Sequence, residues 1–285
     1  MGKKGMILMK QIQLGTSNQK VSSVILGCMR INGAEHPERI IETAFDNGIN
    51  FFDHADIYGG GECETIFASA LAKTSIKREE LFIQTKCGIV PGVMFDFSKK
   101  HIIESVEGSL KRLKMDYVDA LLLHRPDTLV EPEEVAEAFD ELEKSGKVRY
   151  FGVSNQKPMQ VELLKKYVKQ PLLINQLQFG LKHSGMIDQG IHVNMTDEAS
   201  VDHDGSVLDY SRLNEMTIQA WSPYQYGFFE GVFIGNEKFP KLNQKLADLA
   251  EKYHTTPPGL ASAWILRHPA NIQVIAGTMN VGRIK

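Results

Sequence analysis

Four polar side chains stand where runs of apolar residues end. Asp53 follows Ile-Asn-Phe-Phe, Tyr58 lies five residues later, Lys86 follows Leu-Phe-Ile-Gln-Thr, and His124 follows Val-Asp-Ala-Leu-Leu-Leu. If these runs are neighbouring strands of a barrel, their carboxyl ends meet at one mouth. A carboxylate, a phenol, an ammonium and an imidazole gathered there can protonate a carbonyl oxygen. The set indicates a reductase.

The elements that position these residues alternate between strand and helix. Strands are expected at 21–27, 49–54, 81–85, 118–123, 150–153, 172–178, 217–221 and 272–276. Helices are expected at 36–48, 62–73, 98–115, 132–145, 157–168, 241–253 and 259–267. Eight strands with helices between them are the number that a closed (β/α)8 barrel requires. The sequence therefore predicts an α/β fold, a TIM barrel, as one domain over residues 1–285.

Three segments fall outside this alternation. Residues 10–21 predict a β-hairpin that caps the closed end of the barrel, and residues 180–208 predict a large loop. The seven residues after Thr278 start a helix but are too few to complete a stable one. We therefore expect either a truncated final helix or a last strand that is covered differently. An open doubly wound sheet is the alternative, but the turn at Gly59–Gly61 lacks the Gly-x-Gly-x-x-Gly pattern of that fold.

Composition narrows the class of protein. The formal net charge of −3 gives no basic patch for nucleic acid or an acidic membrane surface. Three scattered cysteines are too few for a disulfide framework. The N-terminal residues carry positive charge but no apolar run typical of a secretory signal, and no stretch approaches the roughly 18 apolar residues of a membrane span. We expect a cytoplasmic protein that acts on a small molecule.

On its motifs, the chain resembles the aldo-keto reductase family over essentially its full length, and most of all that family's uncharacterised bacterial oxidoreductases. The motifs are Asp53-x-x-x-x-Tyr58-Gly59, Thr85-Lys86, Leu122-Leu123-His124, Gly152-Val153-Ser154-Asn155, Asn175-Gln176, Trp221-Ser222-Pro223-Tyr224 and Ala276-Gly277-Thr278 with Arg283. The resemblance implies NADPH-dependent reduction of an aldehyde or ketone. It implies that Tyr58 is the general acid, that Lys86 lowers the pKa of the phenol, that Asp53 holds Lys86, and that a neutral His124 orients the carbonyl.

The resemblance also implies a set of cofactor contacts. Ser154, Asn155 and Gln176 would bind the nicotinamide carboxamide, and Trp221 would stack on the ring, although packing of the barrel is the other interpretation of this tryptophan. The pyrophosphate would lie along Ser222, Pro223 and Tyr224, and the adenosine 2′-phosphate beside Gly277, Thr278, Met279, Asn280 and Arg283. Gly277 replaces a basic residue that is frequent in the family, so NADH stays open beside NADPH. The residues that follow Arg283 in the family and contact the adenine would fall beyond Lys285, which predicts weaker binding of the dinucleotide.

Two other functions stay open. A metal-dependent hydrolase could use Asp53, His54, Asp56 and His124, but the later strands offer no further histidine at their ends, so we expect no metal. A nucleotide-sensing regulatory subunit with this barrel and little turnover is the second. The substrate and the oligomeric state are left undetermined. Apolar residues in the predicted loops either form a substrate pocket or only pack the loops; these are Met94, Phe95, Phe97, Tyr226, Phe228 and Phe229.

Overall fold

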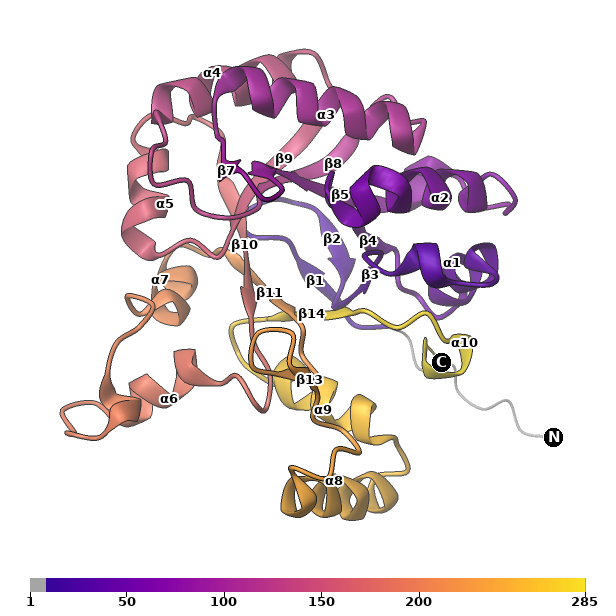
Figure 1. Ribbon diagram of the computed structural model, residues 1–285, viewed down its shortest axis with the longest axis vertical. Helices are drawn as coiled ribbons and strands as arrows, with labels where there is room; N and C mark the ends of the chain where they lie inside the picture. The colour runs from indigo at the N-terminus through magenta and orange to yellow at the C-terminus, as the bar shows by residue number, and fades with distance from the viewer. Residues whose placement is uncertain (1–8, 285) are drawn as a thin grey trace.

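The computed structural model describes residues 9–284, and its centre is a closed barrel of eight parallel strands (Figure 1). Around the barrel, the order is β3 (Val24–Gly27), β4 (Phe51–Asp53), β5 (Phe82–Cys87), β8 (Val118–Leu123), β9 (Val148–Ser154), β10 (Leu172–Gln178), β11 (Thr217–Trp221) and β14 (Gln273–Ala276). The predicted (β/α)8 barrel is confirmed. The organisation as one domain stays a prediction. The N-terminal segment that was searched for a secretory signal lies largely at residues 1–8, outside the described residues.

Helices follow the strands and cover the outside of the barrel. They are α1 (Pro37–Asp46), α2 (Glu62–Leu71), α3 (Lys99–Leu113), α4 (Pro132–Lys144), α5 (Pro158–Lys165), α7 (Val207–Leu213), α9 (Pro257–Leu266) and α10 (Val281–Ile284). Proline opens several of them, because the first turn of a helix leaves its N–H groups without intrahelical partners. The seven residues after Thr278 thus begin a helix, as expected, at Val281. None of the helices among residues 9–284 is long and apolar enough to cross a membrane.

The predicted first strand, 21–27, is wrong as a single element. It divides between β2 (Lys20–Ser22), which pairs antiparallel with β1 (Gln11–Gln13), and barrel strand β3. Leu14, in the turn of this hairpin, is fully buried, and the Gly15 N–H donates to Thr217 Oγ1 (2.8 Å) at the start of β11. The hairpin therefore closes the amino-terminal end of the barrel, as predicted.

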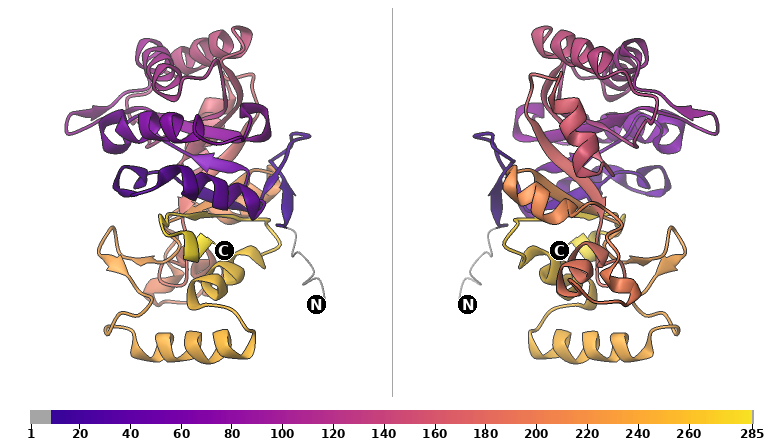
Figure 2. Two further views of the ribbon diagram at one scale, coloured as in Figure 1. Left: turned by 90° about the vertical axis from the view of Figure 1, so that its right-hand side faces the viewer. Right: turned by 90° about the vertical axis from the view of Figure 1, so that its left-hand side faces the viewer.

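Short elements that the sequence pattern missed stand on the opposite side, at the mouth. They are the hairpin of β6 (Ile89–Val90) and β7 (Met94–Phe95) after β5, and the hairpin of β12 (Gln225–Tyr226) and β13 (Gly231–Val232) after β11. Figure 2 shows both on the side of the barrel away from the β1–β2 hairpin. The expected loop 180–208 contains α6 (Gly185–Ile191), a 3₁₀ turn (Glu198–Ser200) and the start of α7. The helix expected at 241–253 is present as α8 (Pro240–Lys252) and packs on α9. Segments of two to seven residues are too short to show a clear hydrophobic period.

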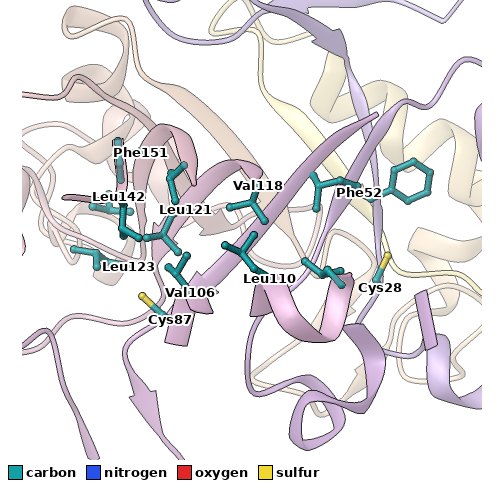
Figure 3. Close-up of a cluster of buried hydrophobic side chains, with 14 of the residues drawn as sticks. Cys28, Phe52, Cys87, Val106, Leu110, Val118, Leu121, Leu123, Leu142 and Phe151 are labelled. Carbon is teal, nitrogen blue, oxygen red and sulfur yellow. The ribbon is translucent and has the colours of Figure 1, made fainter. Parts of the chain in front are cut away.

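The pleat of the strands decides which side chains face the site. In β8, Leu121 and Leu123 belong to the cluster between barrel and helices (Figure 3), whereas Ala120 and Leu122 belong to the cluster inside the barrel. Successive residues point to opposite faces of a strand, so the next residue, His124, continues the inward set. The same alternation turns Asp53 and Lys86 inward from β4 and β5, because Phe51 and Phe82 are interior residues.

Gly152 on β9 marks a close approach inside this barrel. A Cβ atom there would lie 2.7 Å from Leu122 Cδ2 and 2.8 Å from Ile174 Cβ. We expect Gly152→Ala to lower the free energy of unfolding by about 1–3 kcal/mol through overpacking, measured by urea denaturation. Gly190→Ala is the control, since an added Cβ on this α6 residue meets no atom within 4 Å and helix propensity favours alanine. Equal stability of the two variants would contradict the expectation.

Candidate active site

The ammonium group of Lys86 is the centre of the site. Its side chain is fully buried, and Nζ donates to Asp53 Oδ2 (2.8 Å), Tyr58 Oη (3.0 Å) and the backbone oxygen of His54 (2.7 Å). An ammonium has three N–H donors, so these three acceptors satisfy it completely. Burial acts to lower the pKa of Lys86, but Asp53 and Tyr58 raise it above its ordinary value. Lys86 is therefore a fixed positive charge beside the phenol at neutral pH.

The second oxygen of Asp53 is held by two glutamines, of which the sequence analysis singled out only Gln176, and that as a cofactor contact. Asp53 Oδ1 accepts from Gln84 Nε2 (2.6 Å) and Gln176 Nε2 (3.1 Å), and both amides also donate to Gln219 Oε1 (2.9 and 3.0 Å). Gln219 in turn donates to Gln273 Oε1 (3.1 Å) on β14. Four buried amides from four strands thus fix the carboxylate, and a fully bonded buried network of this kind is rigid. The signal for these glutamines in the sequence is the presence of a polar amide within strands whose other residues are mostly apolar.

Tyr58 lies in the turn after β4, where Gly59 and Gly60 adopt left-handed φ angles of 58° and 64°. Its ring is half-buried, and its hydroxyl contacts Lys86 as described. Lys86 does act to lower the pKa of Tyr58, as predicted, but desolvation by burial outweighs it and the net pKa is raised. The expectation of a net lowering of the phenol pKa is therefore wrong. The phenol stays protonated at neutral pH, which is the state that a general acid needs.

His124 stands beside Tyr58, with ring centroids 6.0 Å apart in an edge-to-face arrangement. Its Nδ1 is buried and has no hydrogen-bond partner among residues 9–284. Burial, with the charges of Lys86 and Arg125, holds the pKa of His124 well below its usual range. The imidazole is therefore neutral, as predicted, with one ring N–H to donate and one ring nitrogen to accept.

His54 and Asp56 are not part of this cluster. The ring of His54 faces outward from β4 and packs edge-on against Phe67 of α2, with centroids 4.5 Å apart. Asp56 is half-buried, and burial together with Glu64 raises its pKa to about 6. The ligand set that a metal-dependent hydrolase would require is thus not assembled, because Asp53 pairs with Lys86 while His54 points away from the mouth.

The buried His54 predicts a specific pH dependence of stability. Both ring nitrogens lack partners among the described residues, and burial lowers the pKa from 6.5 to about 3. In the unfolded chain the His54 imidazole therefore binds a proton below pH 6.5, whereas in the native chain it binds one only near pH 3. The free energy of unfolding thus falls as the pH falls through this window. Between pH 7.5 and pH 5 the free energy of unfolding should drop by about 2 kcal/mol more for the wild type than for His54→Leu.

Urea denaturation at the two pH values checks this expectation. His124 and Asp56 titrate in both proteins, so the difference between them isolates His54. The backbone oxygen that accepts from Lys86 is retained in the leucine variant. Parallel pH profiles for the two proteins would show that His54 is not kept neutral in the native state.

Three of the predicted cofactor residues meet at the mouth, at the ends of β9 and β11. Trp221 Nε1 donates to Asn155 Oδ1 (3.1 Å), and Asn155 Nδ2 donates to Ser154 Oγ (2.7 Å). Ser154 Oγ in turn donates to the backbone oxygen of Gln176 (3.0 Å), whereas the Gln176 side chain turns to Asp53. The indole ring is thereby fixed across the mouth, with the ring of Phe229 stacked 6.2 Å away.

The other predicted cofactor residues lie in two segments, 222–224 after β11 and 277–283 after β14. Tyr224 is directed toward α9, where its hydroxyl bonds Ser262 Oγ (2.7 Å), and Ser222, one residue past β11, has a left-handed φ of 48°. Pro223 stands between them. The segment after β14 is Gly277, Thr278, Met279, Asn280 and then α10, with the Asn280 N–H bonded to Thr278 Oγ1 (3.2 Å). Arg283 on α10 is exposed and makes no ion pair with any residue of the described chain.

A closed (β/α)8 barrel with a tyrosine hydrogen-bonded to a buried lysine–aspartate pair at its mouth is an acid–base site on an enzyme fold. Comparison with known proteins identifies the family. The sequence model described as "Aldo/keto reductase family" matches residues 23–285, and the chain belongs to this family. Membership supports an oxidoreductase that uses a nicotinamide cofactor.

Individual relatives agree with this assignment. The chain is 38% identical to "Uncharacterized oxidoreductase YcsN" of Bacillus subtilis, over 97% of this chain and 90% of that protein. It is 33% identical to "6-dehydroglucose reductase" of Agrobacterium fabrum (93% and 87%) and 31% identical to "Putative voltage-gated potassium channel subunit beta" of Schizosaccharomyces pombe (93% and 83%). Among solved structures it is similar to the thermostable aldo-keto reductase Tm1743, with a TM-score of 0.75, 25% identity, and coverage of 97% and 92%.

Proposed function

We propose that this protein reduces an aldehyde or ketone to an alcohol with a nicotinamide cofactor, and that Tyr58 is the general acid. The observation that carries the proposal is the hydrogen bond between Lys86 Nζ and Tyr58 Oη, made by a lysine that Asp53 holds charged inside the barrel. A phenol beside a fixed cation can give up its proton at the moment a carbonyl oxygen gains charge, because the cation stabilises the phenolate that remains.

Tyr58, Lys86 and His124 have different roles at the carbonyl oxygen of the substrate. Tyr58 donates its proton to that oxygen, and the ammonium of Lys86 then balances the phenolate at 3.0 Å. A neutral His124, whose Nδ1 has no hydrogen-bond partner among the described residues, donates a hydrogen bond from its ring to the same oxygen and orients the carbonyl. Asp53 contacts neither the carbonyl oxygen nor the Tyr58 hydroxyl. Its role is to position Lys86, and the glutamine network in turn positions Asp53.

The donor set fits a nicotinamide dinucleotide. Trp221 offers a fixed aromatic ring at the mouth for the nicotinamide, Ser154 and Asn155 lie beside it, and the exposed guanidinium of Arg283 suits a phosphate. When bound, the cofactor supplies the hydride. Arg283 favours NADPH, whereas Gly277 removes a cation from the same segment, so NADH is the competing cofactor to be measured beside it.

NADPH and NADH oxidation with a panel of carbonyl compounds tests the proposal. The panel should include aromatic and aliphatic aldehydes and an oxidised sugar, since one relative is named a 6-dehydroglucose reductase. We expect turnover with at least one class of aldehyde. A regulatory subunit is the second candidate, supported by the likeness to a putative potassium channel subunit. Tight NADPH binding with no turnover across the panel would favour that candidate over the reductase.

A further inference from the structure

A second cation, which the proposed chemistry does not use, stands at the mouth. Arg125 directly follows His124, and its guanidinium carbon lies 5.6 Å from the ring centroids of both Trp221 and Phe228. The two aromatic rings attract the guanidinium by cation–π interaction. Such an interaction uses none of the five N–H donors of a guanidinium, so they stay available for hydrogen bonds.

Arg125 differs from the other half-buried arginines of the described chain in having no partner. Arg78 pairs with Asp119 (2.7 Å), and Arg112 pairs with the fully buried Glu64 (2.8 Å). Between residues 9 and 284, nothing forms an ion pair or hydrogen bond with the Arg125 side chain. Burial lowers the pKa of Arg125 and the nearby Tyr58 phenol raises it in part, so the cation and the phenol share one electrostatic environment.

We propose that Arg125 binds an anionic group of the carbonyl substrate, and hence that the preferred substrates are aldehydes or ketones that carry a carboxylate or phosphate. A guanidinium presents its donors in a planar fork that matches these groups and gives a bidentate bond. The inference deepens the proposed reductase function and rests on it for the identity of the reacting group.

The place of Arg125 in the barrel favours the substrate over the cofactor as the source of this anion. Arg125 follows β8, and the segment with Arg283 follows β14. These strands are four positions apart in either direction around the eight-stranded barrel, and so lie opposite each other. Arg125 also adjoins His124, the residue proposed to hold the carbonyl oxygen. The neighbouring Phe228 and Phe229 are exposed, 64% and 51%, and offer apolar contact to the body of such a substrate.

A matched pair of aldehydes separates charge from shape. We would compare 4-carboxybenzaldehyde with its methyl ester in the wild type and in Arg125→Gln. The ratio of kcat/KM for the acid over the ester is expected to fall about 10- to 100-fold in the variant, the usual effect of losing a hydrogen-bonded ion pair. Arg125→Lys keeps the positive charge but lacks the planar fork of N–H donors. Its ratio of kcat/KM for the acid over the ester should lie between those of the wild type and Arg125→Gln. Arg39→Gln, at an exposed position of α1, removes a charge that has no ion-pair partner within residues 9–284 and should leave the ratio unchanged.

The remaining outcomes are each decisive. A ratio that is the same in wild type and Arg125→Gln overturns the proposal. A weakened Kd for NADPH in that variant, with both aldehydes losing activity in parallel, assigns Arg125 to the cofactor's phosphates and also overturns it. If the wild type reduces neither of these aldehydes nor any other carbonyl compound of the panel, the reductase proposal has failed, and calorimetry still decides the binding question. In that case 4-(hydroxymethyl)benzoate should bind the wild type about tenfold more tightly than the variant, and equal affinity would overturn the assignment.

Discussion

Tyr58→Phe is expected to lower kcat for carbonyl reduction by a factor of about 10² to 10⁴, the contribution typical of a positioned general acid. Only the hydroxyl is removed, and within the described chain its hydrogen bond is to Lys86. Lys86 keeps its bonds to Asp53 and to the backbone oxygen of His54, so the buried pair stays intact. The variant should therefore fold with nearly wild-type stability and bind NADPH with an unchanged Kd.

Steady-state kinetics with one aldehyde, together with urea denaturation and NADPH titration, checks all three statements. A kcat within threefold of the wild type would show that another group protonates the carbonyl oxygen. A large loss of stability would show instead that the phenol is a structural element, and the kinetic loss could then not be assigned to proton transfer.

Lys86→Met is expected to abolish measurable reduction and to lower the free energy of unfolding by about 3–5 kcal/mol. The reason is that Asp53 is left as a buried carboxylate whose counter-charge has gone. The phenolate formed by proton transfer loses the same cation. Activity and stability are thus lost together, unlike in Tyr58→Phe, and the two variants distinguish the acid from the residue that supports it.

A double variant separates the two effects of Lys86. In Asp53→Asn/Lys86→Met both charges are absent, so no uncompensated charge is buried and part of the lost stability should return. Activity should not return, because the cation beside Tyr58 is still missing. Urea denaturation of the single and double variants measures this. A double variant as unstable as Lys86→Met would show that packing around the lysine, not charge, sets the stability loss.

Much of the site was predictable because strand pleat and barrel topology follow from local sequence. Val118–Leu123 and Leu172–Gln178 are found with the predicted bounds, and Thr217–Trp221 likewise. Parallel strands buried on both faces have apolar runs with sharp ends. The polar residues that follow such runs, His124 among them, then have to lie at the mouth, so the convergence of the four site residues could be inferred without coordinates.

Other features depend on contacts between distant segments. The amide network of Gln84, Gln176 and Gln219 needs three strands in register around the barrel, which no local pattern reveals. The sign of the Tyr58 pKa shift needed the balance between burial and charge, because proximity to Lys86 by itself indicates the opposite direction. His54 was a candidate metal ligand because it follows Asp53, and its packing against Phe67 of α2 is a contact between distant segments that the sequence does not reveal.

The stoichiometry of a single turnover tests the central claim most directly. Protein saturated with NADPH would be mixed with an excess of an aldehyde from the panel, and both NADPH absorbance and alcohol product would be measured. We expect one alcohol to form for each NADPH oxidised, and neither change to occur in Tyr58→Phe on the same time scale. Bound NADPH that persists unoxidised in the wild type, with every aldehyde and ketone tried, would contradict it.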